Sequence, residues 1–493
     1  MLDLHGYCLA LDQGTFSSRA TVYDQHGHVI TTSQQSILLH RIDQNQVEQN
    51  AEDILASILF VLKKATSNLE ETIKPILIAG LATQRSSILA WKPSNGQAIS
   101  PVLSWQDTRA HQWLNSFQSH APLIESITKL RLSPHYGVSK INWLTEHLDE
   151  VKKAIIENDC IISPIASYLL FHLSTDHNYT IDSANASRML LQNIHIQDWD
   201  PQLLTLFSIN KSLLPVISHT SSHYGTIKNS AIDIGVINGD QNAALYQNGQ
   251  PDPSSLRINL GTGAFVLTPV TENILNSTRF KNSGLLAGIS NSQELSSDFY
   301  IEGTVNGAGA AVAWLNQHYP LIDFPEDLNQ INFEQVTPPI FINTVGGLGA
   351  PYWCSDIDPE FINHEPTDQN IPQTMLALLE SIIFLLMINI ERIRDIKTAI
   401  HYIEISGGLS KVNILCQSLS DLSQLVVRKT GGTEATSKGI AWLAWNHYLQ
   451  HSPDWATPLT TEGWLPQINP SLHSRYLQFK KQLSALIDSS EKS

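Results

Sequence analysis

A short polar turn near the N-terminus is the first group of residues whose spacing suits chemistry. An apolar run at residues 7–11 ends at Asp12, and the polar positions around the turn are Asp12, Gln13, Gly14, Thr15, Ser17 and Arg19. Backbone N–H groups, hydroxyls and a guanidinium can hold phosphate oxygens while a carboxylate at a strand end faces a hydrated magnesium ion. A single Asp-x-Gly turn is more often only a turn, so this loop needs support from the rest of the chain.

Asp240 is the candidate general base. It follows an apolar run at residues 232–237 through Asn238 and Gly239, and it precedes Gln241. A carboxylate that ends a strand within a cleft can take the proton from a hydroxyl nucleophile. The alternative for a single residue of this kind is an ordinary helix N-cap.

Three further residues could line a pocket for a polyol. The guanidinium of Arg85 can bond hydroxyl groups, and the aromatic faces of Trp105 and Phe265 can cover a carbon chain. Each is individually more often a packing or surface residue. The chain contains neither a GxxxxGK[ST] loop nor a GxGxxG turn after a strand, so any nucleotide site must be of another kind.

The elements that would position these residues predict an α/β fold. Apolar runs at residues 7–11, 21–23 and 29–32 indicate a strand and a hairpin, and apolar residues at helical spacing follow Asn50, which is a good N-cap. Later helices are expected near residues 413–422 and 435–448. A strand, a Gly/Thr turn and a strand occur again at residues 256–267. We therefore expect two duplicated lobes flanking a cleft, with residues 1–248 in one domain and residues 249–493 in the other.

Composition limits the classes of partner. The 493 residues carry a formal net charge of -16 and include no Lys/Arg-rich run, which argues against nucleic acid and anionic membranes. The longest apolar run, at residues 382–390, is far short of the ~20 residues needed to cross a bilayer. Four scattered cysteines form no CxxC pair. We expect a cytoplasmic protein with no membrane partner.

Nine motifs are distributed along most of the chain in a recognisable order. They are ALDQGTFSSRA at residues 10–20, ATQRSS at 82–87, SWQDTRA at 104–110, NASRMLLQNIHIQDWD at 185–200, NGDQNAALY at 238–246, NLGTGAF at 259–265, GLGAPYW at 347–353, LLESI at 378–382 and SGGLSKVN at 406–413. Together they resemble the FGGY family of carbohydrate kinases, and within it the glycerol kinases most closely.

The resemblance implies a fold, cofactors and a site. The fold is two ribonuclease-H-like lobes of the actin, hexokinase and Hsp70 superfamily, with ATP and Mg²⁺ as cofactors. The N-terminal lobe would carry the acceptor and the phosphate loop, and the C-terminal lobe would bind the nucleotide. Asp240 would be the catalytic base, and Asp12 and Asp240 the metal ligands. The implied ATP-binding residues are Gln13, Gly14, Thr15, Ser17, Arg19, Gly261, Thr262, Gly263, Gly307, Gly309, Gly407, Gly408 and Asn413. The implied acceptor-binding residues are Gln84, Arg85, Ser86, Trp105, His135, Asp240, Gln241 and Phe265.

The sequence departs from the glycerol kinase pattern in the acceptor pocket and at two other places. Ser86 stands where that pattern has a glutamate after Gln-Arg, and His135 stands where it has a tyrosine. Residues 361–365 replace a Gly-Leu-Thr-Arg-Gly segment. The stretch at residues 224–239 is shorter than in glycerol kinases regulated by fructose bisphosphate, and it lacks their Gly-Gly and Arg.

We therefore expect an ATP-dependent kinase that phosphorylates a hydroxyl of a small polyol or sugar. Glycerol remains among the acceptors, and a sugar kinase of the xylulose or ribulose type is the alternative within the enzyme class. A nucleotide-dependent scaffold with an actin-like fold and no small-molecule acceptor is the alternative from another class. The presence of Arg85 and Asp240 argues against the scaffold, since it would need no base beside a polyol site. A homodimer is compatible with the resemblance.

Overall fold

The chain divides into two compact units that are not continuous halves. The computed structural model describes residues 6–67, 69, 74–319, 333, 336–430, 434–453, 455 and 463–490. Unit 1 contains Met1–Pro251, Gly288–Phe299 and Gly432–Thr457, and unit 2 contains Asp252–Ala287, Tyr300–Gly431 and Pro458–Ser493. The functional division at residues 248 and 249 into an acceptor lobe and a nucleotide lobe stays a prediction.

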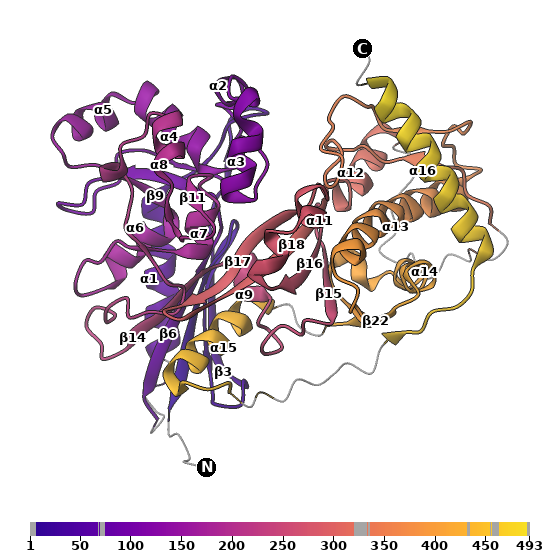
Figure 1. The fold of residues 1–493 in the computed structure, drawn as a ribbon. Helices are drawn as coiled ribbons and strands as arrows, with labels where there is room; N and C mark the ends of the chain where they lie inside the picture. The colour runs from indigo at the N-terminus through magenta and orange to yellow at the C-terminus, as the bar shows by residue number, and fades with distance from the viewer. Residues whose placement is uncertain are drawn as a thin grey trace. The chain divides into compact units, whose positions relative to one another are not determined.

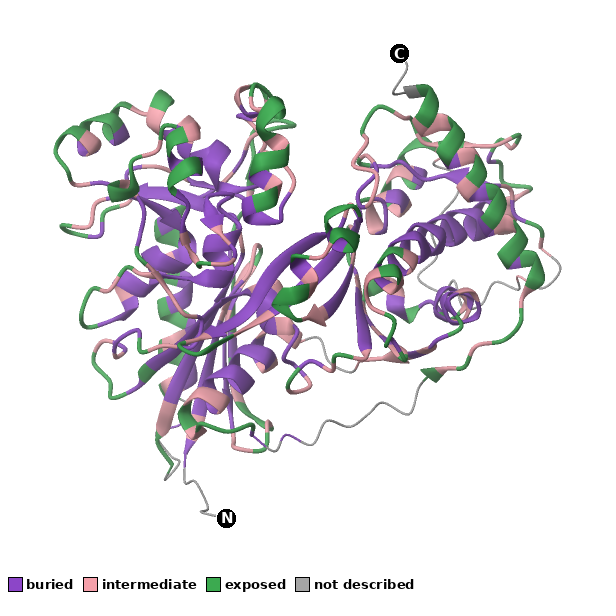
Figure 2. Cartoon of the chain, in the orientation of Figure 1, coloured by how far each residue is buried: buried purple, intermediate pink, exposed green. Residues whose placement is uncertain are grey.

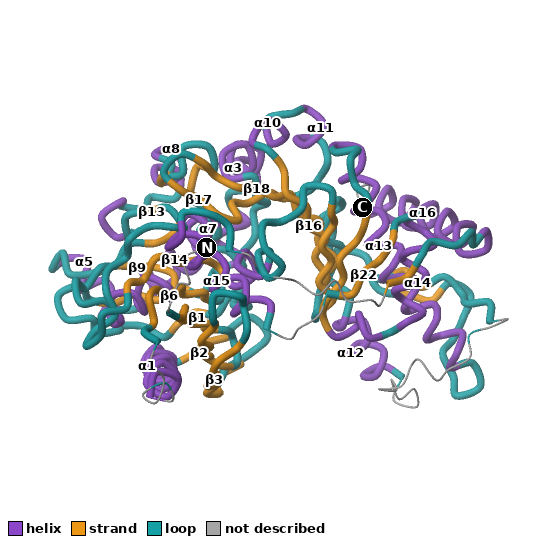
Figure 3. Tube along the Cα trace, turned by 90° about the horizontal axis from the view of Figure 1, so that it is seen from below, coloured by secondary structure: helices purple, strands orange, loops and turns teal. Residues whose placement is uncertain are grey.

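Unit 1 is built on a five-stranded mixed sheet with the order β14-β6-β1-β2-β3. The strands are β1 (Tyr7–Gln13), β2 (Ser17–Tyr23), β3 (Val29–Ser36), β6 (Ile76–Thr83) and β14 (Asp233–Gly239). β1, β2 and β3 are antiparallel neighbours, whereas β1, β6 and β14 run parallel. The predicted hairpin is therefore present, and Figures 1 and 3 show these strands side by side. β1 extends through Gln13, beyond the predicted end of the strand, because Gln13 pairs with Ser18.

Two helices far apart in the sequence cover opposite faces of this sheet. α1 (Ala51–Ser67) begins at Asn50, whose Oδ1 accepts the Glu52 N–H at 2.8 Å, and this confirms the predicted N-cap. The Ser57 hydroxyl of α1 lies 2.7 Å from that of Ser18. On the other face α15 (Ala435–Leu449) lies so close to β6 that a Cβ at Gly80 would be 2.8 Å from Ile440. Figure 1 shows α15 beside strands from the N-terminal end of the chain.

The remaining elements of unit 1 form smaller sheets and helices around this core. A second five-stranded sheet has the order β4-β5-β8-β7-β9. Its strands are β4 (His40–Arg41), β5 (Val47–Gln49), β7 (Ile88–Trp91), β8 (Val102–Leu103) and β9 (Ile161–Pro164). Two short pairs join β10 (Ile181–Asp182) to β13 (Ile217–Ser218) and β11 (Gln192–Asn193) to β12 (Asp198–Trp199). The helices are α2 (His111–Asn115), α3 (Ala121–Thr128), α4 (Gly137–His147), α5 (Asp149–Ile156), α6 (Ile165–Leu173), α7 (Ser183–Ser187), α8 (Pro201–Leu206) and α9 (Asp240–Ala244).

Unit 2 repeats the strand pattern of unit 1. The sheet order is β17-β18-β16-β15-β21-β22-β23. The strands are β15 (Ser255–Leu260), β16 (Ala264–Val270), β17 (Leu286–Gln293), β18 (Ser296–Val305), β21 (Tyr402–Gly407), β22 (Val426–Lys429) and β23 (Gly463–Trp464). Most of β17 and the start of β18 fall within Gly288–Phe299, which is assigned to unit 1. β15 is antiparallel to β16 and parallel to β21, which is parallel to β22. Because β1, β2, β6 and β14 have the same relations, the predicted duplication of the fold is confirmed.

A long helix forms the core of unit 2. α13 (Ile371–Ile396) is long and apolar enough to cross a membrane by length and composition, but 83% of its most apolar window is buried within the protein. Figure 2 shows it in the colour of buried residues. Arg475 of α16 (Pro470–Ser490) donates to Glu380 of α13 at 2.7 Å. The other elements of unit 2 are α10 (Glu272–Leu275), α11 (Thr278–Lys281), α12 (Gly309–His318), α14 (Asn413–Ser423), β19 (Phe341–Ile342) and β20 (Glu360–Phe361).

Candidate active site

The carboxyl ends of three parallel strands bring the two candidate carboxylates together in unit 1. In the register of the sheet Asp12 and Asn238 both lie opposite Ala82, so Asp240 follows β14 just beyond the level of Asp12. Neighbouring strands lie about 4.8 Å apart, which places the backbones of β1 and β14 about 10 Å from each other. Side chains of aspartate length can bridge part of that distance. The edge where parallel strands end is where α/β sheets bind ligands.

Burial and mutual repulsion disfavour the charged form of Asp12. Burial, and after it the charge of Asp240, raise the pKa of its carboxyl to about 7, although the charge of Arg19 opposes both effects. Arg19 lies directly opposite Asp12 in the β1/β2 pair. Burial also raises the pKa of Asp240, against the charges of Arg85 and Arg188. The two carboxylates thus share a site that a cation would stabilise.

The donors at this edge fit Mg²⁺. Mg²⁺ prefers oxygen ligands and keeps several waters, so one or two carboxylates are enough to hold it beside substrate phosphates. Asp12 and Asp240 supply two such carboxylates that influence each other electrostatically. No group of three or more His, Cys, Asp or Glu side chains suited to a metal occurs among the residues that the structure describes. An all-protein cage is not what Mg²⁺ requires.

Asp240 is the first residue of α9, and Gly239 occupies the N-cap position without a side-chain cap bond. The alternative interpretation of Asp240 as an N-cap is therefore wrong. Its Oδ1 accepts the Gln241 N–H at 2.7 Å and lies 3.8 Å from Nε of Arg85. Nη1 of Arg85 donates to Oδ1 of Asn242 at 2.8 Å. A Cβ at Gly239 would lie 2.6 Å from the Arg85 side chain, so glycine at 239 is what lets the guanidinium reach Asp240.

The turn after β1 is held by side chains from neighbouring elements. The Gly14 N–H donates to the Ser17 carbonyl at 2.9 Å. Gln34 of β3 links two predicted phosphate ligands, because it donates to the Ser17 hydroxyl at 3.1 Å and accepts from Arg19 at 2.9 Å. Arg19 also forms an ion pair with Glu434, which precedes α15. Arg19, Asp12 and the start of α15 thus share one face of the sheet.

Apart from Asp240 and Gln241, the predicted acceptor residues of unit 1 come from three segments. Trp105 is 41% exposed, its Nε1–H donates to the Thr15 hydroxyl at 3.0 Å, and its carbonyl lies 3.1 Å from Nδ1 of His135. Ser86 follows Arg85 with a φ of +62°, a strained value for a residue other than glycine. Gln84 is buried, and its side chain bonds to other side chains of the protein.

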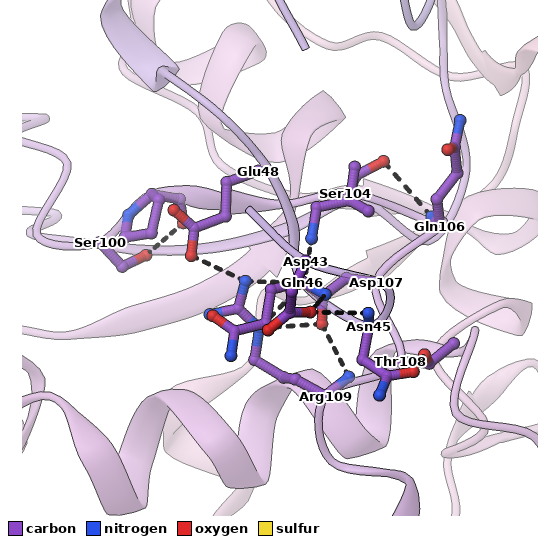
Figure 4. A network of polar contacts seen from close by, with 12 residues as sticks. Asp43, Asn45, Gln46, Glu48, Ser100, Ser104, Gln106, Asp107, Thr108 and Arg109 are labelled. Atoms are coloured by element: carbon purple, nitrogen blue, oxygen red, sulfur yellow. Dashed lines mark hydrogen bonds and ion pairs between the residues drawn. The ribbon is translucent and has the colours of Figure 1, made fainter. Parts of the chain in front are cut away.

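A largely buried ionic cluster of Arg109, Asp107 and Glu48 stabilises the segment that carries Trp105. Figure 4 shows Arg109 against Asp107 and Glu48. Nη2 of Arg109 lies 2.7 Å from a carboxylate oxygen of each, and the guanidinium lies 4.4 Å from the ring of Trp143. The same Oδ2 of Asp107 that contacts Nη2 of Arg109 also accepts the Val47 N–H at 2.8 Å, which ties the segment to β5. Bidentate Arg–carboxylate pairs are rigid, so the cluster fixes the backbone that carries Trp105.

Lys140 connects this cluster to His135. Its Nζ donates to the His135 carbonyl at 2.6 Å. Burial lowers the pKa of Lys140 to about 7, although the charge of Asp107 opposes the shift. Lys140 thus holds the backbone at His135, and Trp143 packs on the Arg109 guanidinium of the cluster.

The predicted nucleotide residues of unit 2 also converge. Leu260 and Gly407 end the adjacent parallel strands β15 and β21 opposite each other. The Gly309 N–H donates to the Gly261 carbonyl at 3.0 Å, and the Ala310 N–H to that of Thr262 at 2.8 Å. α12 therefore begins against the turn at residues 261–263.

Close packing explains the glycines of this region. A Cβ at Gly263 would lie 3.0 Å from the Val305 carbonyl, and a Cβ at Gly307 would lie 2.3 Å from Asn343. A Cβ at Gly309 would lie 2.8 Å from the Gly261 carbonyl. At Gly407, where φ is +93°, a Cβ would lie 2.4 Å from the Leu260 carbonyl. Gly408 has open space in the Cβ direction. Asn413 begins α14 after the turn, and Phe265 lies on β16 opposite Asn259. Backbone N–H groups can thus be exposed in a confined turn, as phosphate binding requires.

Several residues of unit 1 that bond to these groups, or act on them through their charge, were not predicted from the sequence. They are Gln34, Gln49, Ser87, Arg188 and Asn242. Ser87, Arg188 and Asn242 lie inside the motifs at residues 82–87, 185–200 and 238–246. Their place in these motifs could have marked them as site residues. Gln34 and Gln49 lie outside every recognised motif, and only their position on β3 and β5 brings them to the site.

Comparisons with known proteins agree with the fold. The N-terminal domain of the FGGY family of carbohydrate kinases matches residues 7–238, and its C-terminal domain matches residues 256–446. A glycerol kinase of Acinetobacter baylyi is 29% identical over 89% of both chains. A glycerol kinase of Alkalilimnicola ehrlichii is 31% identical over 88% of this chain and 89% of its own.

Solved structures share the whole fold. Plasmodium falciparum glycerol kinase with ADP has a TM-score of 0.84 at 24% identity and covers 99% of this chain and 98% of its own. A xylulose kinase from Lactobacillus acidophilus has a TM-score of 0.82 at 18% identity and covers 99% of both chains. The predicted family and fold class are confirmed, and the scaffold alternative is not supported. The chain belongs to the FGGY family of carbohydrate kinases and is an ATP-dependent kinase that phosphorylates a sugar or polyol.

Proposed function

We propose that Asp240 is the general base that activates the acceptor hydroxyl. The observation that carries this role is its place at the end of β14, with Arg85 Nε at 3.8 Å and the charge of Asp12 nearby. Asp240 takes the proton as the hydroxyl oxygen forms its bond to the γ-phosphorus of ATP. The bond from that phosphorus to the β–γ bridging oxygen breaks, and ADP leaves. Such transfers depend mainly on alignment and charge neutralisation.

Asp12 and Asp240 are the proposed ligands of Mg²⁺. When bound, Mg²⁺ neutralises charge on the phosphates. The raised pKa of both carboxyls supports the assignment, because each carboxylate lies in a site that favours added positive charge.

The phosphates of ATP are assigned to the polar turn of unit 1 and the glycine turns of unit 2. Thr15, Ser17 and Arg19, with the backbone of Gln13 and Gly14, form the first group. The second group is Gly261, Thr262, Gly263, Gly307, Gly309, Gly407, Gly408 and Asn413. The relative from Plasmodium falciparum with ADP supports nucleotide binding on this fold.

The acceptor is proposed to be a polyol or ketose of about four or five carbons, because Ser86 leaves room that a glutamate would fill and His135 offers a polar tip. Arg85, Trp105, Gln241 and Phe265 would hold the remaining hydroxyls and the carbon chain.

Glycerol is the second candidate. The glycerol kinases named above and the retained residues of the pocket favour it. A xylulose or ribulose acceptor is the third, which the structural likeness to xylulose kinase keeps open.

We propose that the enzyme is cytoplasmic and binds neither nucleic acid nor membranes. The net charge of -16 supports it. A homodimer is the proposed assembly, and sedimentation of the purified chain would test it.

The decisive experiment measures ADP release from ATP with glycerol, erythritol, ribitol, xylulose and ribulose. Acceptor-dependent release that is largest for a four- or five-carbon compound is the expected result. The highest kcat/KM with glycerol would overturn the proposed acceptor, and ADP release that no acceptor stimulates would overturn the substrate class.

A further inference from the structure

Thr15 accepts hydrogen bonds from two side chains, those of Gln49 and Trp105. Trp105 is a predicted acceptor residue, whereas Gln49 was given no role from the sequence. The Thr15 carbonyl accepts Nε2–H of Gln49 at 2.8 Å, and the Thr15 hydroxyl accepts Nε1–H of Trp105 at 3.0 Å. Gln49 ends β5, whereas Trp105 follows β8. One residue of the phosphate turn is therefore held directly by the wall of the acceptor pocket.

The two bonds belong to one closed circuit. Oε1 of Gln49 accepts Nε2–H of Gln84 at 2.9 Å, and Oε1 of Gln84 accepts the Ser87 hydroxyl at 2.9 Å. The Ser87 oxygen in turn accepts the backbone N–H of Trp105 at 3.1 Å. Starting from Thr15, the path runs through Gln49, Gln84, Ser87 and Trp105 and returns to Thr15. We call these five residues the circuit.

A branch of the circuit reaches the start of the phosphate turn. Nε2 of Gln84 also donates to Oε1 of Gln13 at 3.2 Å, and Nε2 of Gln13 donates to the Gly14 carbonyl at 2.7 Å. Both amide hydrogens and the amide oxygen of Gln84 thus have partners within the protein. An acceptor hydroxyl would have to compete with these bonds to reach Gln84.

The middle of the circuit is closed to water. Gln49 and Gln84 are 1% exposed and Ser87 is fully buried. Removing one partner from such a chain leaves another polar group buried without a bond, so the remaining members must move or stay unsatisfied. A shift of about 1 Å between reacting groups can cost about a hundredfold in rate.

We propose that Gln49 and Gln84 are positioning residues that set the acceptor wall at Trp105 against the phosphate turn at Thr15. They touch neither the acceptor nor the nucleotide. This inference rests on the proposed functions of Thr15 and Trp105, and it gives Gln84 a role different from the acceptor ligand predicted from sequence.

The test compares two variants at opposite sides of the circuit. Gln49→Met keeps the approximate volume and removes both bonds of the amide, and Ser87→Ala removes only a hydroxyl, so it carries little risk of misfolding. Gln192→Met is the matched control, because Gln192 is also 1% exposed and lies on β11 outside the circuit. The acceptor is the compound among glycerol, erythritol, ribitol, xylulose and ribulose with the highest kcat/KM.

Misalignment predicts a particular kinetic pattern. In both circuit variants kcat should fall about ten- to a hundredfold, while the KM for ATP and for the acceptor changes less than about threefold. The ratio of ADP released to acceptor phosphorylated should rise above that of the wild type, since water reaches the misaligned phosphate. The double variant should be no slower than the slower single variant, because both changes break one unit. Gln192→Met should leave kcat and the ratio unchanged.

Each other outcome overturns the inference. A kcat equal to that of Gln192→Met, a higher acceptor KM with normal kcat, or multiplicative losses in the double variant would each do so. Urea unfolding tests the circuit without measuring turnover. The midpoint shift of the double variant should be smaller than the sum of the shifts of the two single variants. Additive shifts would contradict a shared circuit. A wild type that phosphorylates none of the acceptors would refute the proposed function, while the unfolding experiment would still decide on the circuit.

Discussion

Asp12→Asn should make the ligand-free protein more stable above neutral pH while abolishing most of its turnover. The folded state raises the pKa of Asp12 from its ordinary 3.8 to about 7, chiefly by burial and then by the charge of Asp240. Between these values the folded protein keeps a proton that the unfolded chain releases. Stability linked to Asp12 is therefore fully present below about pH 4 and is lost as the pH rises through about 7.

The size of the effect follows from the shift. Each pKa unit corresponds to ~1.4 kcal/mol, so the ionised carboxylate costs the folded state at most about 4 kcal/mol. Asparagine has nearly the same shape and no charge, but its amide must also be desolvated, so we expect a gain of about 2 kcal/mol. At about 2–4 °C per kcal/mol for a unit of this size, the melting temperature should rise by about 4–8 °C.

Thermal unfolding at about pH 8.5 and about pH 5 gives the comparison, since the first value lies above the window from 3.8 to about 7 and the second lies in its lower part. Asp233→Asn is the control, because Asp233 is an exposed carboxylate at the start of the same strand β14. The gain of Asp12→Asn should be large at the higher pH and small at the lower, and Mg²⁺ should stabilise the wild type more than the variant. A gain equal at both values, or no larger than that of Asp233→Asn, would refute the reasoning.

The remaining predictions concern chemistry, specificity and regulation. Asp240→Asn should lower turnover by about 10²–10⁴ without loss of ATP affinity, and near-normal turnover in a steady-state assay would contradict its role as base. Ser86→Glu combined with His135→Tyr should raise kcat/KM for glycerol about tenfold, because a charged hydrogen bond contributes about 1.5–3 kcal/mol; an unchanged value would argue against the pocket assignment. Fructose bisphosphate should not inhibit, because residues 224–239 lack the Gly-Gly turn and the Arg that would bind its phosphates; inhibition that mutations in this segment remove would refute this.

The features that could be predicted from the sequence depend on residues close to one another in the chain. The apolar run before Asp12 and the Asn50 cap before α1 depend on neighbours a few residues away, and both appear in the structure. The partners of the site depend on distant contacts. Gln49 bonds Thr15 across 34 residues of sequence, and Arg85 bonds Asn242 across 157. The spacing of residues along the chain does not indicate which distant side chains form hydrogen bonds. These contacts could therefore not be predicted without knowing the order of the strands in the sheet.

The same reason explains the place of α15. Its sequence predicts a helix at residues 435–448, but nothing local indicates that it packs on β1 and β6 of unit 1, more than 350 residues earlier. The Cys8 thiol lies 3.7 Å from the Ala441 carbonyl, and Arg19 pairs with Glu434. The face that carries Asp12 is thus completed by a segment from the far end of the chain.

Ser86 stands in the proposed acceptor pocket where the glycerol kinase pattern has a glutamate, and its backbone is held by its neighbours. Its φ of +62° is uncommon for any residue with a side chain, so the turn itself must be stabilised elsewhere. The neighbours on both sides are held, Arg85 by Asn242 and Ser87 by Gln84. These bonds fix the backbone of residue 86 whatever side chain it has. We therefore propose that serine in place of a glutamate at this position alters the choice of acceptor while Arg85 stays beside Asp240.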